Sequence, residues 1–198
     1  NNRTNVNLDN LYIVFDVSTI GAKNLLPIVM FIATDFVWSK VKEDRTQDKI
    51  VLLDEVWKLI NTNDTVAEYV LELYKTIRGY GGGVVCATQD LTDFTALKNG
   101  MYGNRILSNS SAKIIMKIQS ENLNEIRRVF SLTEDEFDSI LAMKKGQGIL
   151  ISNQDNVMIN VMASEKEDRL ITTDASKLRG YYGDSKQIER EQQRRIAG

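Results

Sequence analysis

The sequence contains no histidine and only one cysteine, Cys86, among its 198 residues. Without histidine, the chain lacks the commonest zinc ligand and the usual Ser-His and Cys-His nucleophile pairs. A single cysteine cannot form a disulfide within the chain, which is consistent with a reducing compartment. Because Cys86 lies in an apolar run, we predict an inert buried thiol there. Any chemistry must therefore use carboxylates, amides, hydroxyls, lysine or arginine.

Long apolar runs and a large excess of one charge are also missing. The longest apolar run, residues 25–33, is too short to span a bilayer. The formal net charge of −2 gives no global reason to expect a nucleic-acid or membrane surface. Hydrophobic residues make up 42% of the chain and charged residues 26%, as in an ordinary globular domain. Since strand-like sequence follows almost directly after Asn1, we expect the chain to be part of a longer protein.

Strand-like segments alternate with segments of helical periodicity over most of the chain. The predicted strands are 11–18, 50–55, 84–90 and 112–118, the predicted helices are 24–42, 64–78, 121–130 and 133–145, and a predicted β-hairpin joins 148–152 to 157–163. This order is typical of an α/β fold with a parallel sheet covered by helices. Because the sequence becomes polar at Ser164, we predict one domain over 1–163 and a polar, partly helical tail over 164–198.

Two predicted strands end in polar residues. The stretch KIVLLDEVWKLI runs from an apolar strand into Asp54 and Glu55, and VVCATQD ends with Thr88 and Gln89 followed by another acid. The carboxyl ends of parallel strands meet at one sheet edge, and one helical crossover fits between these two strands. We therefore expect the two ends to lie close together.

Two interpretations of these residues remain open. In the first, Asp54 caps the following helix, Glu55 favours its N-terminus, and the residues after the second strand form a simple turn. In the second, the acids belong to a nucleotide-hydrolysis site. There the first carboxylate holds Mg²⁺, the second polarises the attacking water, and an amide at the next strand end holds that water or the γ-phosphate in line.

The segments VLLDEVWKLI and TIRGYGGGVVCATQD together resemble the C-terminal half of the ATPases of conjugative type IV secretion systems. These ATPases belong to the FtsK–HerA group and have the RecA-like P-loop NTPase fold, with three layers and a mostly parallel sheet. The resemblance runs from about residue 11 to the hairpin at 157–163. It implies a hexameric ATPase that uses ATP and Mg²⁺ to drive channel assembly or substrate transfer. It also implies a cytoplasmic protein at the inner face of the cell membrane, with other secretion-channel proteins and DNA as candidate partners.

The same resemblance implies a role for individual residues. Asp54 would be associated with Mg²⁺ through water, Glu55 would be the general base, and Gln89 would be the sensor amide, with Thr88 beside it at the nucleotide. Arg78, at the end of the helix before the Gln89 strand, would act on the nucleotide of a neighbouring subunit. The alternative for Arg78 is a favourable charge at a helix C-terminus.

The sequence departs from the family pattern because it contains no G-x-x-x-x-G-K-[ST] phosphate loop. The glycines at 79 and 81–83 are followed by Val84 and so are expected to form a turn. The family's phosphate loop lies upstream, and we therefore expect half an active site, inactive by itself, in a sheet that lacks the phosphate-loop strand. That gap should leave the strands at 84–88 and 112–118 paired directly or with an exposed edge. The rival functions are a DNA-pumping translocase or helicase of the same superfamily and a non-hydrolysing interaction module.

Overall fold

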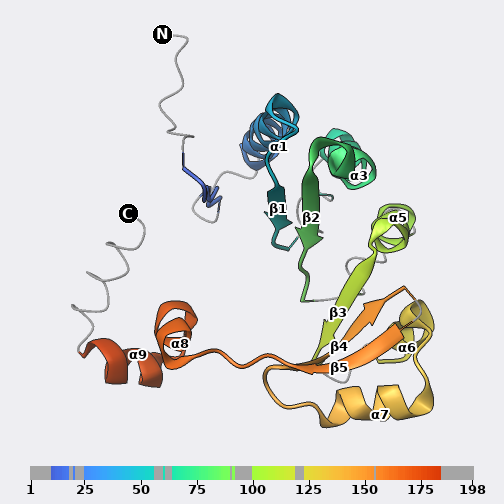
Figure 1. Cartoon of the computed structure of the whole chain (residues 1–198), viewed down its shortest axis with the longest axis vertical. Coiled ribbons are helices and arrows are strands. Elements are labelled where there is room, and N and C mark those ends of the chain that lie inside the picture. Colours follow the sequence, from blue (N-terminus) through green and yellow to red (C-terminus); the bar gives the residue numbers. More distant parts are fainter. Residues whose placement is uncertain are drawn as a thin grey trace. The chain divides into compact units, whose positions relative to one another are not determined.

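The computed structural model describes residues 10–17, 20, 25–55, 60, 64–89, 91, 100–118, 123–153 and 155–183 (Figure 1). The chain divides into two units, which we describe separately: unit 1 comprises residues 1–113 and 119–133, and unit 2 comprises 114–118 and 134–198. The elements are α1 (Leu26–Glu43), β1 (Lys49–Leu53), α3 (Asp64–Thr76), the 3-10 helix η1 (Ile77–Tyr80), β2 (Gly82–Cys86), α5 (Met101–Asn109), β3 (Ala112–Met116), α6 (Leu123–Phe130), α7 (Glu134–Ala142), β4 (Gln147–Ser152), β5 (Asp155–Asn160), α8 (Glu165–Ile171) and α9 (Ala175–Tyr182).

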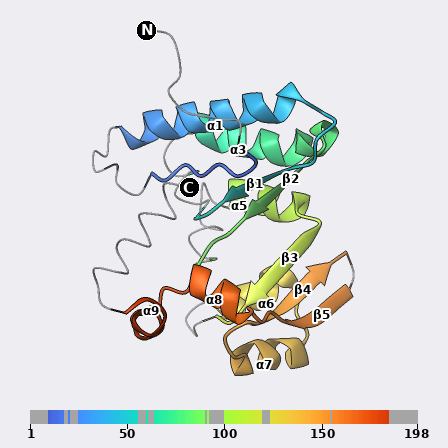
Figure 2. The same cartoon turned by 60° about the vertical axis from the view of Figure 1, so that its left-hand side comes forward.

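Helices α1 and α3 form one layer of unit 1 and lie along each other in Figure 2. Helix α1 begins with Pro27 in its first turn, where the missing amide hydrogen costs no helical hydrogen bond. Its buried residues include Trp38 and Val41, which pack with Leu73 of α3. The predicted helix at 64–78 buries one apolar stripe, formed by Val66, Val70 and Leu73 of α3 and Ile77 of η1. Burying one apolar stripe of each helix stabilises this layer.

Strands β1 and β2 form a two-stranded parallel sheet in unit 1. Alternate residues point to opposite faces, and Val51, Leu53 and Val84 pack on the inner side against the α1–α3 layer. The outer side carries Ile50 and Leu52, which are 77% and 66% exposed. The helices that the structure describes therefore cover one face of this sheet.

The predicted β-hairpin is confirmed in unit 2, where β4 and β5 pair antiparallel and Ser152 lies opposite Asp155. Strand β3 pairs with the other side of β4. A Cβ at Gly148 would lie 2.8 Å from the carbonyl oxygen of Ile115, so glycine allows the backbones of β4 and β3 to approach closely. Helix α7 is joined to β5 by a 2.7 Å hydrogen bond from the Asn156 amide to Glu136.

The polar segment after the hairpin contains α8 and α9. A capping box between Ser164 and Glu167 opens α8. Asp168 then accepts hydrogen bonds from Lys177 and from the Tyr181 hydroxyl, both at 2.9 Å, and so connects α8 to α9. Among the described helices, none combines the length and apolar content needed to cross a bilayer.

The predicted strand at 11–18 is wrong for the part that the structure describes, because residues 12–17 are neither helix nor strand. A strand needs a hydrogen-bonding partner, and none of the described strands pairs with this segment. Leu11 and Tyr12 are accordingly exposed, whereas Phe15 contacts the ring of Phe36 in α1 at 5.9 Å between centroids. A strand-like composition alone did not produce a strand.

The strands at 84–88 and 112–118 were expected either to pair directly or to keep an exposed edge, and direct pairing is not found among the described strands. Among the described strands, β2 pairs only with β1, and β3 pairs only with β4. Each therefore has one edge without a described partner. The other elements of the predicted α/β fold are present. Strands β1 and β2, whose ends carry the polar residues, pair in parallel as expected.

Candidate active site

The parallel pairing of β1 and β2 brings four predicted site residues to one end of the sheet. We call this end, where both strands finish, the carboxyl edge. Leu53 lies opposite Cys86 at the end of the ladder, and the amide of Ala87 donates to the carbonyl of Leu53 at 3.0 Å. Asp54 and Thr88 directly follow these hydrogen-bonded residues, and Glu55 and Gln89 come next along each segment. The two carboxylates and the two neutral polar side chains therefore follow the carboxyl ends of two strands that lie about 4.8 Å apart.

Glu55 has an uncommon backbone conformation for its residue type. Its φ of 49° lies in the left-handed region, and its side chain is half-buried, whereas Asp54, Thr88 and Gln89 are exposed. A non-glycine residue held in an unfavourable backbone region costs about 1–3 kcal/mol, and such residues cluster at functional sites. The turn redirects the chain immediately after β1, so the two neighbouring acids do not continue the alternation of the strand.

The helix-cap interpretation of Asp54 concerns residues 56–59, which lie outside the described part of the chain. The metal-binding interpretation can be compared with the donor set. Among the described residues, no group of three or more His, Cys, Asp or Glu could hold a metal ion. Two adjacent carboxylates nevertheless fit Mg²⁺ that arrives with a nucleotide, because Mg²⁺ in such sites takes one or two carboxylates together with phosphate oxygens and water.

Arg78 lies at the opposite end of the same sheet, where β1 and β2 begin. It belongs to η1, which precedes β2, and β2 starts at Gly82 opposite Lys49, the first residue of β1. Five strand residues at about 3.3 Å each, about 16 Å in total, separate this edge from the carboxyl edge. The Arg78 side chain is exposed and has no hydrogen bond or ion pair with any described residue. An arginine side chain is shorter than this strand, so Arg78 cannot reach Glu55 or Gln89 of its own chain.

Cys86, the last residue of β2, packs against the apolar cluster that contains Val66 and Val70 of α3. Burial raises the pKa of the Cys86 thiol to about 11, although a hydrogen bond with Tyr74 partly opposes this rise. Burial, and next the neighbouring Cys86, raise the pKa of the Tyr74 hydroxyl above its usual range. Both groups therefore stay protonated at neutral pH, and Cys86 is half-buried, whereas the sequence predicted a buried thiol.

We expect Cys86 to react slowly with a thiol reagent such as Ellman's reagent. A thiol pKa of about 11 leaves about 10²-fold less thiolate near neutral pH than an ordinary cysteine has, and the thiolate is the reactive form. The rate should rise steadily as the pH approaches 11 and should rise at once when denaturant unfolds the chain. Equal rates in the folded and unfolded chain at neutral pH would contradict the raised pKa of the Cys86 thiol in the folded chain.

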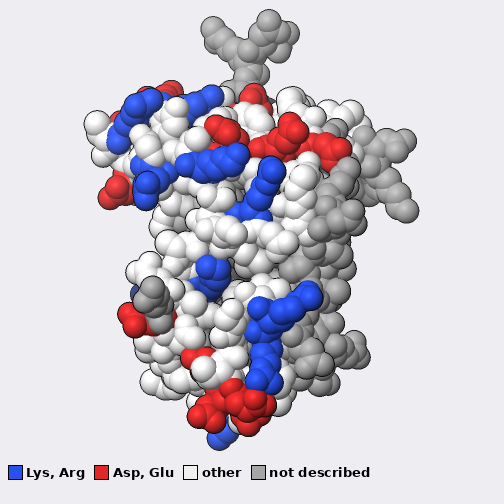
Figure 3. Space-filling model, turned by 90° about the vertical axis from the view of Figure 1, so that its right-hand side faces the viewer, with Lys and Arg blue, Asp and Glu red and all other residues white. Residues whose placement is uncertain are grey.

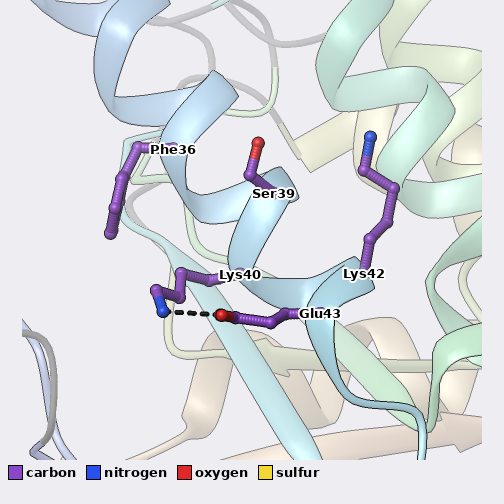
Figure 4. Close-up of a pocket in the computed structure, with 5 residues that line it drawn as sticks. All are labelled: Phe36, Ser39, Lys40, Lys42 and Glu43. Atoms are coloured by element: carbon purple, nitrogen blue, oxygen red, sulfur yellow. Dashed lines mark hydrogen bonds and ion pairs between the residues drawn. The ribbon is translucent and has the colours of Figure 1, made fainter.

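A shallow hollow elsewhere on unit 1 offers no alternative site. It is lined by Phe36, Ser39, Lys40, Lys42 and Glu43, all from the second half of α1, and Lys40 pairs with Glu43 there (Figure 4). Within the described residues no second element contributes a side chain to this hollow, so no groups from different elements converge on a ligand there. Acidic side chains also lie among the basic ones on the face drawn in Figure 3, as the net charge of −2 suggests.

Comparisons with known proteins show the family to which this chain belongs. Residues 1–193 match the family model of the TraG P-loop domain. Protein TraC of Escherichia coli is 29% identical over 116 residues, which is 58% of this chain and 13% of TraC. The DNA import protein CedB of Sulfolobus acidocaldarius is 27% identical over 146 residues, 69% of this chain and 23% of CedB. The type IV secretion system protein CagE of Helicobacter pylori is 27% identical over 124 residues, 62% of this chain and 12% of CagE.

Among solved structures, VirB4 of Thermoanaerobacter pseudethanolicus superposes with a TM-score of 0.73 at 25% identity and covers 82% of this chain and 44% of that one. The chain thus spans less than a quarter of the length of these curated relatives and less than half of the VirB4 chain. These matches confirm the predicted RecA-like α/β fold. They also confirm the resemblance to type IV secretion ATPases. The chain belongs to the TraG P-loop domain family.

Proposed function

We propose that the protein containing this chain is an ATPase of a conjugative or type IV secretion apparatus. ATP hydrolysis would drive channel assembly or substrate transfer. The observation that carries the proposal is the parallel pairing of β1 with β2, because the acids 54–55 and the polar residues 88–89 follow the carboxyl ends of these two strands. The similarity to TraC, CagE and VirB4 supports the kind of machine.

Each residue at the edge has a role that suits its chemistry. Asp54 would hold the nucleotide's Mg²⁺ through water, and the ion would supply positive charge against the phosphates. Glu55 accepts a proton from the attacking water and orients it. The Gln89 amide holds that water or the γ-phosphate in line, and the Thr88 hydroxyl donates a hydrogen bond to the nucleotide.

The remaining contacts with the nucleotide would come from residues other than these four. A phosphate loop would cradle the triphosphate with backbone amides and a lysine. The 198-residue sequence does not contain that motif. We propose that it belongs to another part of the same protein. Arg78, which its own site cannot use, would serve the site of the next subunit in a hexamer. The assembly would lie at the inner face of the cell membrane with other secretion-channel proteins.

The 198-residue chain alone is expected to release phosphate from Mg²⁺-ATP no faster than background, whereas the full-length protein hydrolyses ATP. The reason is that the phosphate loop supplies most of the contacts to the triphosphate. Phosphate release measured on both proteins tests this. Turnover by the chain alone that Glu55→Gln abolishes would mean that the nucleotide site is misplaced. An inactive full-length protein would favour a non-hydrolysing interaction module.

A DNA-moving ATPase is the second candidate. The specific observation in its favour is the similarity to CedB, named as a DNA import protein, over 69% of this chain. The same carboxyl-edge residues would serve either function, because the chemistry of hydrolysis is common to both. Stimulation of the ATPase of the full-length protein by DNA is the measurement that separates the two.

A further inference from the structure

Lys49, the first residue of β1, connects two segments of unit 1 through its side chain. Its ammonium group donates to the backbone carbonyls of Asp44, Gln47 and Tyr80, the last two at 3.2 and 3.1 Å. An ammonium group has three N–H donors, and here each has a carbonyl acceptor. Two of the carbonyls belong to the loop between α1 and β1, and the third belongs to η1. The half-buried lysine therefore acts as a cross-link between the loop and the turn that carries Arg78.

The backbone joins the same two segments beside this cross-link. The Lys49 amide donates to the Gly81 carbonyl at 3.1 Å, and the Gly81 amide donates to the Arg78 carbonyl at 3.2 Å. Gly81 has a φ of +70°, and a Cβ there would lie 3.0 Å from the carbonyl oxygen of Arg45. Glycine is thus required both by the left-handed conformation and by the close approach of the loop.

The ring of Tyr80 holds the turn from a third direction. The Arg45 guanidinium lies 4.5 Å from the ring centroid, and the buried Trp38 contacts the ring edge-on at 5.4 Å between centroids. Both the carbonyl and the ring of Tyr80 are therefore fixed, two residues after Arg78. These contacts hold the Tyr80 end of the turn, whereas the side chain of Arg78 is exposed.

We propose that Lys49 is a positioning residue that fixes the Arg78 turn so that the guanidinium reaches the nucleotide of the neighbouring subunit. This inference rests on the proposed function of Arg78 in trans. A four-residue 3-10 turn is weakly stable by itself, because its hydrogen-bond geometry is poor. Without the cross-link, the turn samples other conformations and the guanidinium is misplaced, and a misplacement of about 1 Å can cost about 10²-fold in rate.

The test is Lys49→Met in the full-length protein, which keeps a long unbranched side chain, one atom shorter, but removes its three donors. We expect kcat to fall by about 10²-fold while the KM for ATP stays nearly unchanged, because the affected residue belongs to the neighbouring subunit. The matched control is Lys113→Met. Lys113 is also half-buried near the start of a strand and donates to one carbonyl, that of Ser110 at 2.9 Å, but it does not contact the Arg78 turn. Its turnover should remain normal.

Two further measurements distinguish positioning from a general loss of structure. The double variant Lys49→Met/Arg78→Ala should be no slower than Arg78→Ala alone, because both changes act through one guanidinium. Mixing Lys49→Met subunits with Glu55→Gln subunits should recover part of the turnover, since each Glu55→Gln subunit supplies an intact Arg78 turn to an intact site. A misfolded Lys49→Met subunit gives no recovery.

The outcomes separate this inference from the function on which it rests. Normal turnover in Lys49→Met, an additive loss in the double variant, or no recovery on mixing would each overturn the positioning role while Arg78→Ala still shows its own defect. Normal turnover in Arg78→Ala would instead overturn the trans role of Arg78, and the positioning role with it.

Discussion

Replacing Glu55 by glutamine in the full-length protein is expected to remove ATP turnover and to leave nucleotide binding nearly intact. Glutamine keeps the size of the side chain but cannot accept the proton of the attacking water at neutral pH. Loss of a general base typically lowers the rate by about 10²–10⁴-fold. The strained backbone at Glu55 is unaffected by this change, because both residue types meet the same steric limits at a φ of 49°. Phosphate release and the affinity for a fluorescent ATP analogue measure the two properties separately.

The matched control for this experiment is Glu72→Gln. Glu72 is an exposed acid on α3, outside the carboxyl edge, and the same chemical change there should leave turnover unchanged. Normal turnover in Glu55→Gln would restrict Glu55 to the other interpretation of its position, a favourable charge at the start of the following helix. Loss of nucleotide binding together with turnover would indicate a binding role for the carboxylate.

Replacing Arg78 by alanine should lower turnover by about 10³–10⁵-fold, the effect of an arginine that stabilises charge on the transferring phosphoryl group. The structure places Arg78 at the edge of the sheet opposite to Asp54 and Glu55, and this excludes a direct role in its own site. Nucleotide binding should therefore stay nearly intact. Mixed with Glu55→Gln subunits, Arg78→Ala subunits should recover part of their activity, because interfaces then form in which an intact arginine faces an intact base.

Lys75→Ala is the matched control for Arg78→Ala. Lys75 lies in the last turn of α3, where its charge also favours the helix C-terminus, an effect worth about 0.3–1 kcal/mol. If Arg78 serves only as such a charge, both variants should lose a little stability and keep their turnover. Collapse of turnover in Arg78→Ala without recovery on mixing would contradict action across a subunit boundary.

Local sequence patterns were sufficient for most of the elements. The apolar stripe of α3, the long helix α1 and the β4–β5 hairpin were predictable, because helical periodicity and turn residues act within a few positions. The sequence also limited the chemistry, since a chain without histidine must use carboxylates, amides or cations. It placed Asp54 and Gln89 after apolar strands, which predicted their common edge before any pairing was known.

The tertiary structure alone decided what depends on contacts between distant residues. Parallel pairing of Leu53 with Cys86 brought the segments that carry Asp54 and Thr88 to the same end of the sheet, and it left Arg78 at the opposite end. The segment 11–17, although rich in strand-forming residues, stayed unpaired because a strand forms only against a partner. The three carbonyls around Lys49 come from two segments that are separate in sequence, so no local pattern could indicate that this lysine holds the turn of Arg78.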